Sequence, residues 1–181
     1  PLFIHGRSSR FNKSLLDPHT NILRSTAEAF AGVIGGVNSL HIAPYDEVAG
    51  GNDLAARRLA RNTQLLLAEE CGFAEVADAA GGSWYVEKLT DQLARKAWGK
   101  FQEIERAGGM LKFLQSGDPQ RNVSKSAQAR MTRMSQRREQ MVGVNFSPDL
   151  NECFQQAATH SDKGTAADRI PSLSFMRAAE G

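Results

Sequence analysis

Apolar residues gather in short runs that alternate with longer stripes at a spacing of three to four residues. Short runs flanked by turn residues are typical of buried strands, and such stripes are typical of helices that bury one face. The strands are expected at residues 2–4, 37–42, 76–77 and 141–145, and the helices at 17–34, 52–71, 90–107, 110–115 and 122–139.

Capping residues mark the predicted helix starts. Asp17 followed by Pro18 predicts the first start, because Asp serves as an N-cap and Pro fits the first helical position. Asn52 or Asp53 is the expected cap of the second helix, and Thr90 is the expected cap of the third.

Strands that alternate with long helices predict crossover connections and therefore a parallel sheet. Four such strands are half of an eight-stranded barrel. We expect an α/β fold: the C-terminal half of a parallel (β/α) TIM-type barrel, with four β/α units, as a partial domain over residues 1–146. The alternative is an open sheet of four strands. Because the chain opens inside an apolar run and without Met, it is expected to be a piece of a larger barrel.

Composition narrows the function classes. The formal charge of +2 gives no general reason to expect nucleic acid or an anionic membrane as a partner. No apolar run approaches the roughly 20 residues of a membrane span. Cys71 and Cys153 do not have the spacing of metal ligands, so no metal site is expected. Both are expected to be free thiols in a reducing cytoplasm. Residues 147–181 are expected to form a polar extension, with one short helix near 172–179.

Polar residues follow each expected strand, at His5, His41, Asp78 and Asn145. In parallel α/β folds, ligands bind at the carboxyl ends of the strands. A single histidine beside a strand is more often a packed or capping residue. Four polar residues in corresponding positions indicate the mouth of a binding site.

The loop after His5 carries Arg7, Arg10 and Lys13, with two serines between them. Guanidinium groups beside hydroxyls suit a phosphate, because together they donate several hydrogen bonds to its oxygens. A solvated basic loop explains the same residues equally well. Glu47 lies above the second strand, where a carboxylate accepts hydrogen bonds from ribose hydroxyls, positions a histidine, or faces water.

Asn62 falls on the apolar stripe of the second expected helix, between Leu59 and Leu66. A buried Asn without hydrogen-bond partners costs about 1–3 kcal/mol. We therefore expect Asn62 to tie a neighbouring loop to this helix.

A series of short motifs runs through the chain in a fixed order: His5, Asp17-Pro18-x-x-Asn21, Gly35-Gly36, Ser39-Leu40-His41, Asp46-Glu47, Ala60-Arg61-Asn62-Thr63-Gln64, Gly81-Gly82-Ser83-Trp84-Tyr85-Val86-Glu87, Gly108-Gly109-Met110 and Val142-Gly143-Val144-Asn145. The series resembles the late barrel of the methylmalonyl-CoA mutase family over about residues 3–146. That resemblance implies a cobalamin-dependent isomerase acting on short-chain acyl-CoA thioesters, in which an adenosyl radical starts the migration of the carbonyl-CoA group. Adenosylcobalamin is expected in the parent complex and not on this chain alone.

The resemblance also assigns roles to residues. The substrate and CoA side would be lined by His5, Arg7, Arg10, Asn38 and His41. Glu47 matches an acidic residue that contacts the adenosyl ribose. Structural roles are expected for Asp17, Asn62, Gln64, Asp78 and Asn145.

Departures from the family pattern point to one subunit type. The family pattern of catalytic subunits has His-Ser-Gln where this chain has His5-Gly6-Arg7, and it has Asn where this chain has Ala43. These changes resemble the small subunit of heterodimeric mutases, which is thought not to bind cobalamin. Asp17-x-His19 is not a cobalt-ligand motif, because Ile22 stands where that motif needs Gly.

Three hypotheses follow. The first is a fragment of the non-catalytic small subunit, inactive alone and paired with a large catalytic subunit. The second is a fragment of a catalytic acyl-CoA mutase subunit with variant site residues. The third is a small α/β module that binds CoA without catalysis. Open sheet edges would favour self-association of the chain.

Overall fold

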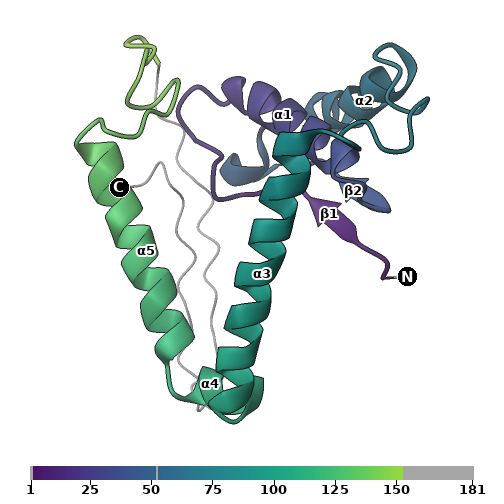
Figure 1. Cartoon of the computed structure of the whole chain (residues 1–181). Coiled ribbons are helices and arrows are strands. Elements are labelled where there is room, and N and C mark those ends of the chain that lie inside the picture. Colours follow the sequence, from purple (N-terminus) through teal and green to yellow (C-terminus); the bar gives the residue numbers. More distant parts are fainter. Residues whose placement is uncertain (1, 52, 153–181) are drawn as a thin grey trace. The chain divides into compact units, whose positions relative to one another are not determined.

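The computed structural model of the chain describes residues 2–51 and 53–152. They form the elements β1 (His5–Arg7), α1 (Thr20–Ile34), β2 (Ser39–His41), a 3₁₀ turn η1 (Glu47–Ala49), α2 (Leu54–Glu69), α3 (Trp84–Arg106), α4 (Gly109–Gln115) and α5 (Asp118–Ser135) (Figure 1). Two compact units divide the described residues: one comprises 2–79 and 131–152, and the other 80–130.

The first unit is built on a β1–α1–β2 connection between two parallel strands (Figure 1). Gly6 pairs with Leu40, and a Cβ added at Gly6 would come within 3.0 Å of the Leu40 Cδ1. A Cβ added at Gly32 of α1 would meet the same Cδ1 at 3.2 Å. The two glycines therefore let α1 lie close against the Gly6–Leu40 face of the sheet.

The core of this unit lies where α1 and α2 pack together beside β2. Ala29, Ile42 and Leu67 are buried in one cluster, and the partly buried Leu40, Ala60 and Phe73 pack around it. The buried face of α1 differs from the predicted stripe: Ala29 is buried, whereas Leu23 and Phe30 are exposed. A second, smaller cluster joins Met134 to Met141, with Phe11 and Val144 against it.

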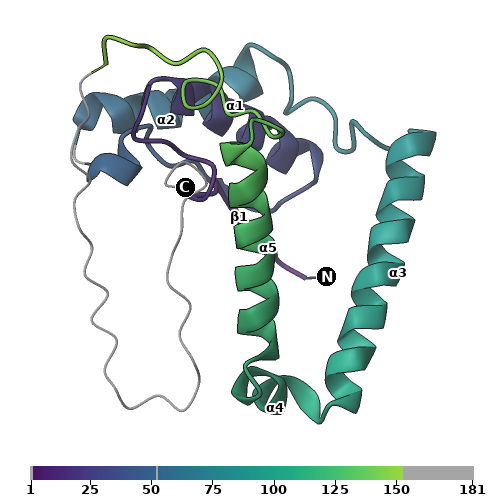
Figure 2. The same ribbon diagram turned by 90° about the vertical axis from the view of Figure 1, so that its left-hand side faces the viewer.

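Three helices, α3, α4 and the first part of α5, form the second unit (Figure 2). The 23-residue α3 has an apolar stripe but no buried residue. Large side chains of that stripe are exposed, with Trp84 at 82%, Leu93 at 58% and Trp98 at 60%. Since burial of one face stabilises an amphipathic helix, this stripe is a surface that packing within the unit leaves uncovered.

The structure corrects the strand predictions. The first strand begins at His5 and not at residue 2, because pairing with β2 starts at the Ile4 carbonyl, which accepts the Asn38 and Ser39 N–H groups. The second is shorter than residues 37–42. Residues 76–77 form no strand and lie between turns. Residues 141–145 form a turn, which a single bridge between Val142 and Phe146 closes.

Helix ends agree better with prediction than helix starts. Asp53 caps α2 as expected, its Oδ1 accepting the Ala55 N–H at 2.9 Å. The Asp17-Pro18 start is wrong: Asp17 has φ of 45°, and α1 begins at Thr20, whose hydroxyl donates to the Asp17 carboxylate. The Thr90 cap is wrong as well, since α3 starts at Trp84.

The expected helix at 172–179 and Cys153 lie outside the described residues.

The chain is thus an α/β protein dominated by helices, with a small parallel sheet. None of the helices in the described ranges is both long enough and apolar enough to cross a membrane.

Substitution of Gly6 tests the close approach of α1 to the sheet. Gly6→Val would force branched methyl groups against Leu40, and we expect a loss of about 1–3 kcal/mol in the free energy of unfolding. Gly99→Ala in α3 is the control, because no atom lies within 4 Å of an added Cβ there. It should instead gain about 0.5–1 kcal/mol from helix propensity. Urea denaturation measures both, and equal stability of the Val variant and the unchanged protein would contradict the packing.

Candidate functional site

The face of the sheet opposite α1 carries polar side chains. Register places His5 beside Ser39 and Arg7 beside His41, so these four residues share one face. The Nδ1 of His5 and the Oγ of Ser39 are 2.6 Å apart. Both histidines therefore lie on the same side of the sheet, and this face is exposed within the chain.

Only His41 lies at the expected carboxyl end of a strand. His5 begins β1 and does not end it, so Arg7 is the residue that stands opposite His41. Asp78 is exposed in a loop, and Asn145 lies in the turn near α5. The expected ring of four strand-end residues is therefore wrong, because two of the four strands are absent from residues 2–51 and 53–152.

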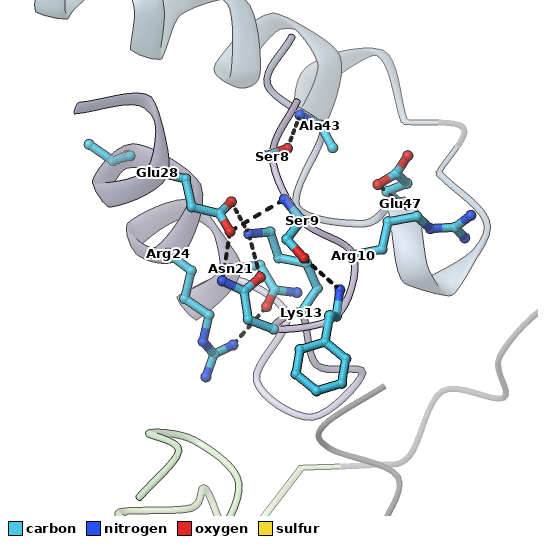
Figure 3. Close-up of polar contacts among 12 residues, drawn as sticks. Ser8, Ser9, Arg10, Lys13, Asn21, Arg24, Glu28, Ala43 and Glu47 are labelled. Atoms are coloured by element: carbon cyan, nitrogen blue, oxygen red, sulfur yellow. Dashed lines mark hydrogen bonds and ion pairs between the residues drawn. The ribbon is translucent and has the colours of Figure 1, made fainter. Parts of the chain in front are cut away.

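An ion-pair cluster joins the loops after the two strands. The Arg7 guanidinium donates to Oε1 of Glu47. Arg10 lies beside the same carboxylate (Figure 3), with its Nε 3.9 Å from Oε2. Both oxygens of Glu47 thus face arginines. The carboxylate that the family resemblance assigns to a ribose contact is hydrogen-bonded within the chain through Oε1, while Oε2 has an ion-pair neighbour but no hydrogen-bond partner among the described residues.

Lys13 leaves the predicted basic loop for the interior. Its side chain is 1% exposed, and its Nζ donates to Glu28 Oε2 at 2.6 Å and to Asn12 Oδ1 at 3.1 Å (Figure 3). The other Glu28 oxygen accepts the Asn12 amide at 2.7 Å and the Ser9 N–H at 3.3 Å. Lys13 is therefore not available to a phosphate. Its role is to hold the loop on α1.

Asn21 is fully buried and fastens three segments. Its Oδ1 accepts the Ser14 N–H at 3.0 Å, and its Nδ2 donates to the Ser14 carbonyl at 2.8 Å and to the Tyr45 carbonyl at 3.0 Å. Ser8 makes a parallel tie, accepting the Ala43 N–H at 2.8 Å. Sequence reasoning gave Asn21 and Glu28 no role. An amide in the first turn of an apolar helix was the available signal for Asn21.

The turn after α5 is fixed by Asn145 and reaches α1. Asn145 Oδ1 accepts the Met141 N–H at 2.6 Å, and its amide donates to the Met134 carbonyl at 2.9 Å and the Glu139 carbonyl at 2.8 Å. Arg24 of α1 donates to the Val142 carbonyl and, at 2.7 Å, to Asn21 Oδ1. Burial lowers the pKa of the Arg24 guanidinium, and the Asp17 carboxylate opposes that shift.

The remaining predicted residues have diverse surroundings. Asn38 is exposed, and its Oδ1 accepts the Ile4 N–H at 2.8 Å. The Asp17 N–H donates to both Glu152 oxygens at 2.7 Å. Asn62 is half-buried, and within the described ranges its side chain makes no hydrogen bond, so the expected tie to a loop is not seen.

Gln64 lines an open groove beside the carboxyl end of β2. The groove has a volume of about 400 Å³. It is bounded by the end of β2, the η1 turn and one face of α2, with the lining residues His41, Ile42, Pro44, Glu47, Gly51, Arg57, Ala60, Arg61 and Gln64. Across the part of the chain that the structure describes, no cluster of three His, Cys, Asp or Glu side chains could hold a metal ion.

Comparison with known proteins gives these residues a family context. The sequence model of the family described as methylmalonyl-CoA mutase matches residues 1–180. The chain belongs to the methylmalonyl-CoA mutase family.

Among its relatives, the chain is 41% identical over 148 residues to a methylmalonyl-CoA mutase small subunit of Streptomyces virginiae, covering 82% of this chain and 24% of the relative. It is 43% identical over 142 residues to a methylmalonyl-CoA mutase of Rhizobium meliloti, covering 78% and 20%. It is 37% identical to a small subunit of Porphyromonas gingivalis, covering 82% and 24%. The chain thus spans about a quarter or less of the length of these relatives.

A double-mutant cycle tests the pair formed by the buried Lys13 and the partly buried Glu28. Lys13→Met leaves the carboxylate without its cation, and we expect a loss of about 3 kcal/mol in the free energy of unfolding. The double variant with Glu28→Gln should lose less than the sum of the two single changes. Lys100→Met is the matched control, because its pair with Glu103 is exposed, and it should cost less than about 1 kcal/mol. Additive losses would show that the two charges do not interact.

Proposed function

We propose that this chain is part of the small, non-catalytic subunit of a heterodimeric methylmalonyl-CoA mutase. Its expected partner is the large catalytic subunit, and the reaction of the complex is the radical interconversion of methylmalonyl-CoA and succinyl-CoA. The names of the Streptomyces and Porphyromonas relatives support the small-subunit assignment. The exposed free thiol of Cys71 and the lack of a recognisable cysteine spacing in the sequence are consistent with a reducing, cytoplasmic setting.

A β/α barrel is the fold that we propose for the parent domain, with residues 1–146 as its C-terminal half and residues 147–181 as an extension. The parallel pair β1 and β2 supports it, since α1 covers one face and polar residues occupy the other. In a barrel, the helices lie outside and the second face points inward. The uncovered stripe of α3 suits a helix that packs on a fuller barrel.

Glu47 carries the non-catalytic assignment. Adenosylcobalamin, when bound in the catalytic subunit, supplies the radical through homolysis of its cobalt–carbon bond. The ion pairs of this chain oppose a contact between Glu47 and the ribose of that group. Arg7 donates to Oε1 of Glu47, and Oε2 lies 3.9 Å from Arg10 Nε without a hydrogen bond among the described residues, so a ribose would have to compete with both guanidiniums for this carboxylate. Where catalytic members have an Asn side chain, Ala43 has no polar side chain, and its backbone N–H already donates to Ser8 Oγ.

This chain's own contribution is then binding and support. The exposed face with His5 and His41 keeps polar groups for an acyl-CoA ligand, with Asn38 beside it. Arg7 and Arg10 pair with Glu47 and would contribute only their remaining N–H groups. Self-association is a further proposal for the isolated chain, because β1 and β2 are the only strands among the described residues and their outer edges lack strand partners.

A catalytic subunit is the second candidate, favoured by the 43% identity to the Rhizobium mutase. It differs from the first in what Glu47 does. If Glu47 contacts the adenosyl group, its loss removes a charge-assisted hydrogen bond from the reaction. If the small-subunit proposal holds, its loss only frees two arginines.

Activity assays separate the two candidates. The full-length parent of this chain, given adenosylcobalamin and methylmalonyl-CoA, should form succinyl-CoA only when the large subunit is added. Within that complex, Glu47→Gln should change kcat by less than about twofold, whereas loss of a charge-assisted contact to the reacting group would lower it about tenfold or more. Turnover by the parent alone would refute the small-subunit proposal.

A further inference from the structure

The groove beside β2 has an unusual charge pattern. Arg57 and Arg61 lie one helical turn apart on the same face of α2, and Gln64 follows on the next turn. Neither arginine has a carboxylate partner anywhere in residues 2–51 and 53–152. Like charges at this spacing destabilise a helix slightly.

The position of Arg57 adds to this cost. It lies in the first turn of α2, which contains no acidic residue, so its charge opposes the helix dipole. Its Nη2 lies 3.4 Å from the Gly51 carbonyl, which places the guanidinium over the turn at the groove rim. An anion bound in the groove would relieve both repulsions.

The nearby carboxylates make no ion pair with these arginines in residues 2–51 and 53–152. Glu47, the acid that lines the groove, is held by Arg7 and Arg10. Asp53 caps α2 through the Ala55 N–H. The Asp46 carboxylate accepts the Asp53 N–H at 3.1 Å. Among the residues that line the groove, Glu47 is the acid and is paired with other arginines, so Arg57 and Arg61 are the lining charges without an ion pair in the described ranges.

From this arrangement we propose that the groove binds the phosphate or diphosphate group of a small ligand. Arg57 and Arg61 are the principal donors, with His41 and Gln64 completing the site from two different elements. Donors that converge from a helix and a strand end suit the oxygens of a phosphate, and two guanidiniums match its charge. The volume of about 400 Å³ lies within the range of ligand sites and leaves room for the group that carries the phosphate.

This site differs from the phosphate-binding loop that the sequence predicts. That loop uses its cations internally, with Lys13 on Glu28 and Arg7 on Glu47. The two arginines of the proposed site come from α2, and neither makes an ion pair within the residues that the structure describes. The proposal stands whether the parent is a small or a catalytic subunit, because it depends only on the groove.

Titration with inorganic pyrophosphate tests the site. The full-length parent in its mutase complex is titrated by isothermal calorimetry, first unchanged and then as the Arg57→Gln/Arg61→Gln variant. Gln keeps the helix propensity and removes both charges. We expect the dissociation constant to rise about tenfold or more, as loss of two charge-assisted hydrogen bonds requires.

Arg58→Gln is the matched control. Arg58 lies on the same helix and is exposed, but it does not line the groove. Its loss should change the dissociation constant by less than about twofold, even though it lowers the net charge of the helix. Equal weakening by the control would show that pyrophosphate responds only to general charge. No measurable binding to the unchanged complex at millimolar concentration would also overturn the proposal. Circular dichroism and subunit pairing verify that each variant is folded.

Discussion

The amide of Asn21 is the interaction on which the geometry of the first unit depends. It lies in the first turn of α1, yet its partners belong to the loops after both strands, at Ser14 and Tyr45. A buried amide left without such partners would cost free energy, so release of either loop from α1 would leave part of this amide unsatisfied. Arg24 extends the same network to the turn at Val142, more than a hundred residues further along the chain.

Because the two loops are fixed in this way, charges from distant segments meet over the ends of the sheet. Arg7 and Arg10 come from one loop and Glu47 from the other, and their contact needs both loops in place. The same loop carries Lys13 to Glu28 on the opposite side. The charges of the loops thus pair with one another or with α1 and hold the fold together. The arginines of the groove, Arg57 and Arg61, belong to α2.

Sequence patterns predicted the helices better than the strands. An apolar stripe spans several turns, so α1 and α2 were found with their ends nearly correct. A three-residue strand leaves no comparable period, and the pair of residues Val76 and Ala77 was too short to define one. Asp17 misled as a cap because its side chain reaches Thr20 from a left-handed turn. Of the site, the shared face of His5 and His41 follows from alternation, whereas the burial of Lys13 depends on a partner fifteen residues away.

The burial of Lys13 has a consequence for chemistry at its amine. Acetylation and other acylation reactions require a neutral, accessible ε-amine, and this one is 1% exposed and bound to a carboxylate. An amine-reactive label should therefore modify exposed residues such as Lys100 long before it reaches Lys13. Labelling at Lys13 would report the moment at which the loop lifts from α1, which makes this side chain an intrinsic probe of local opening.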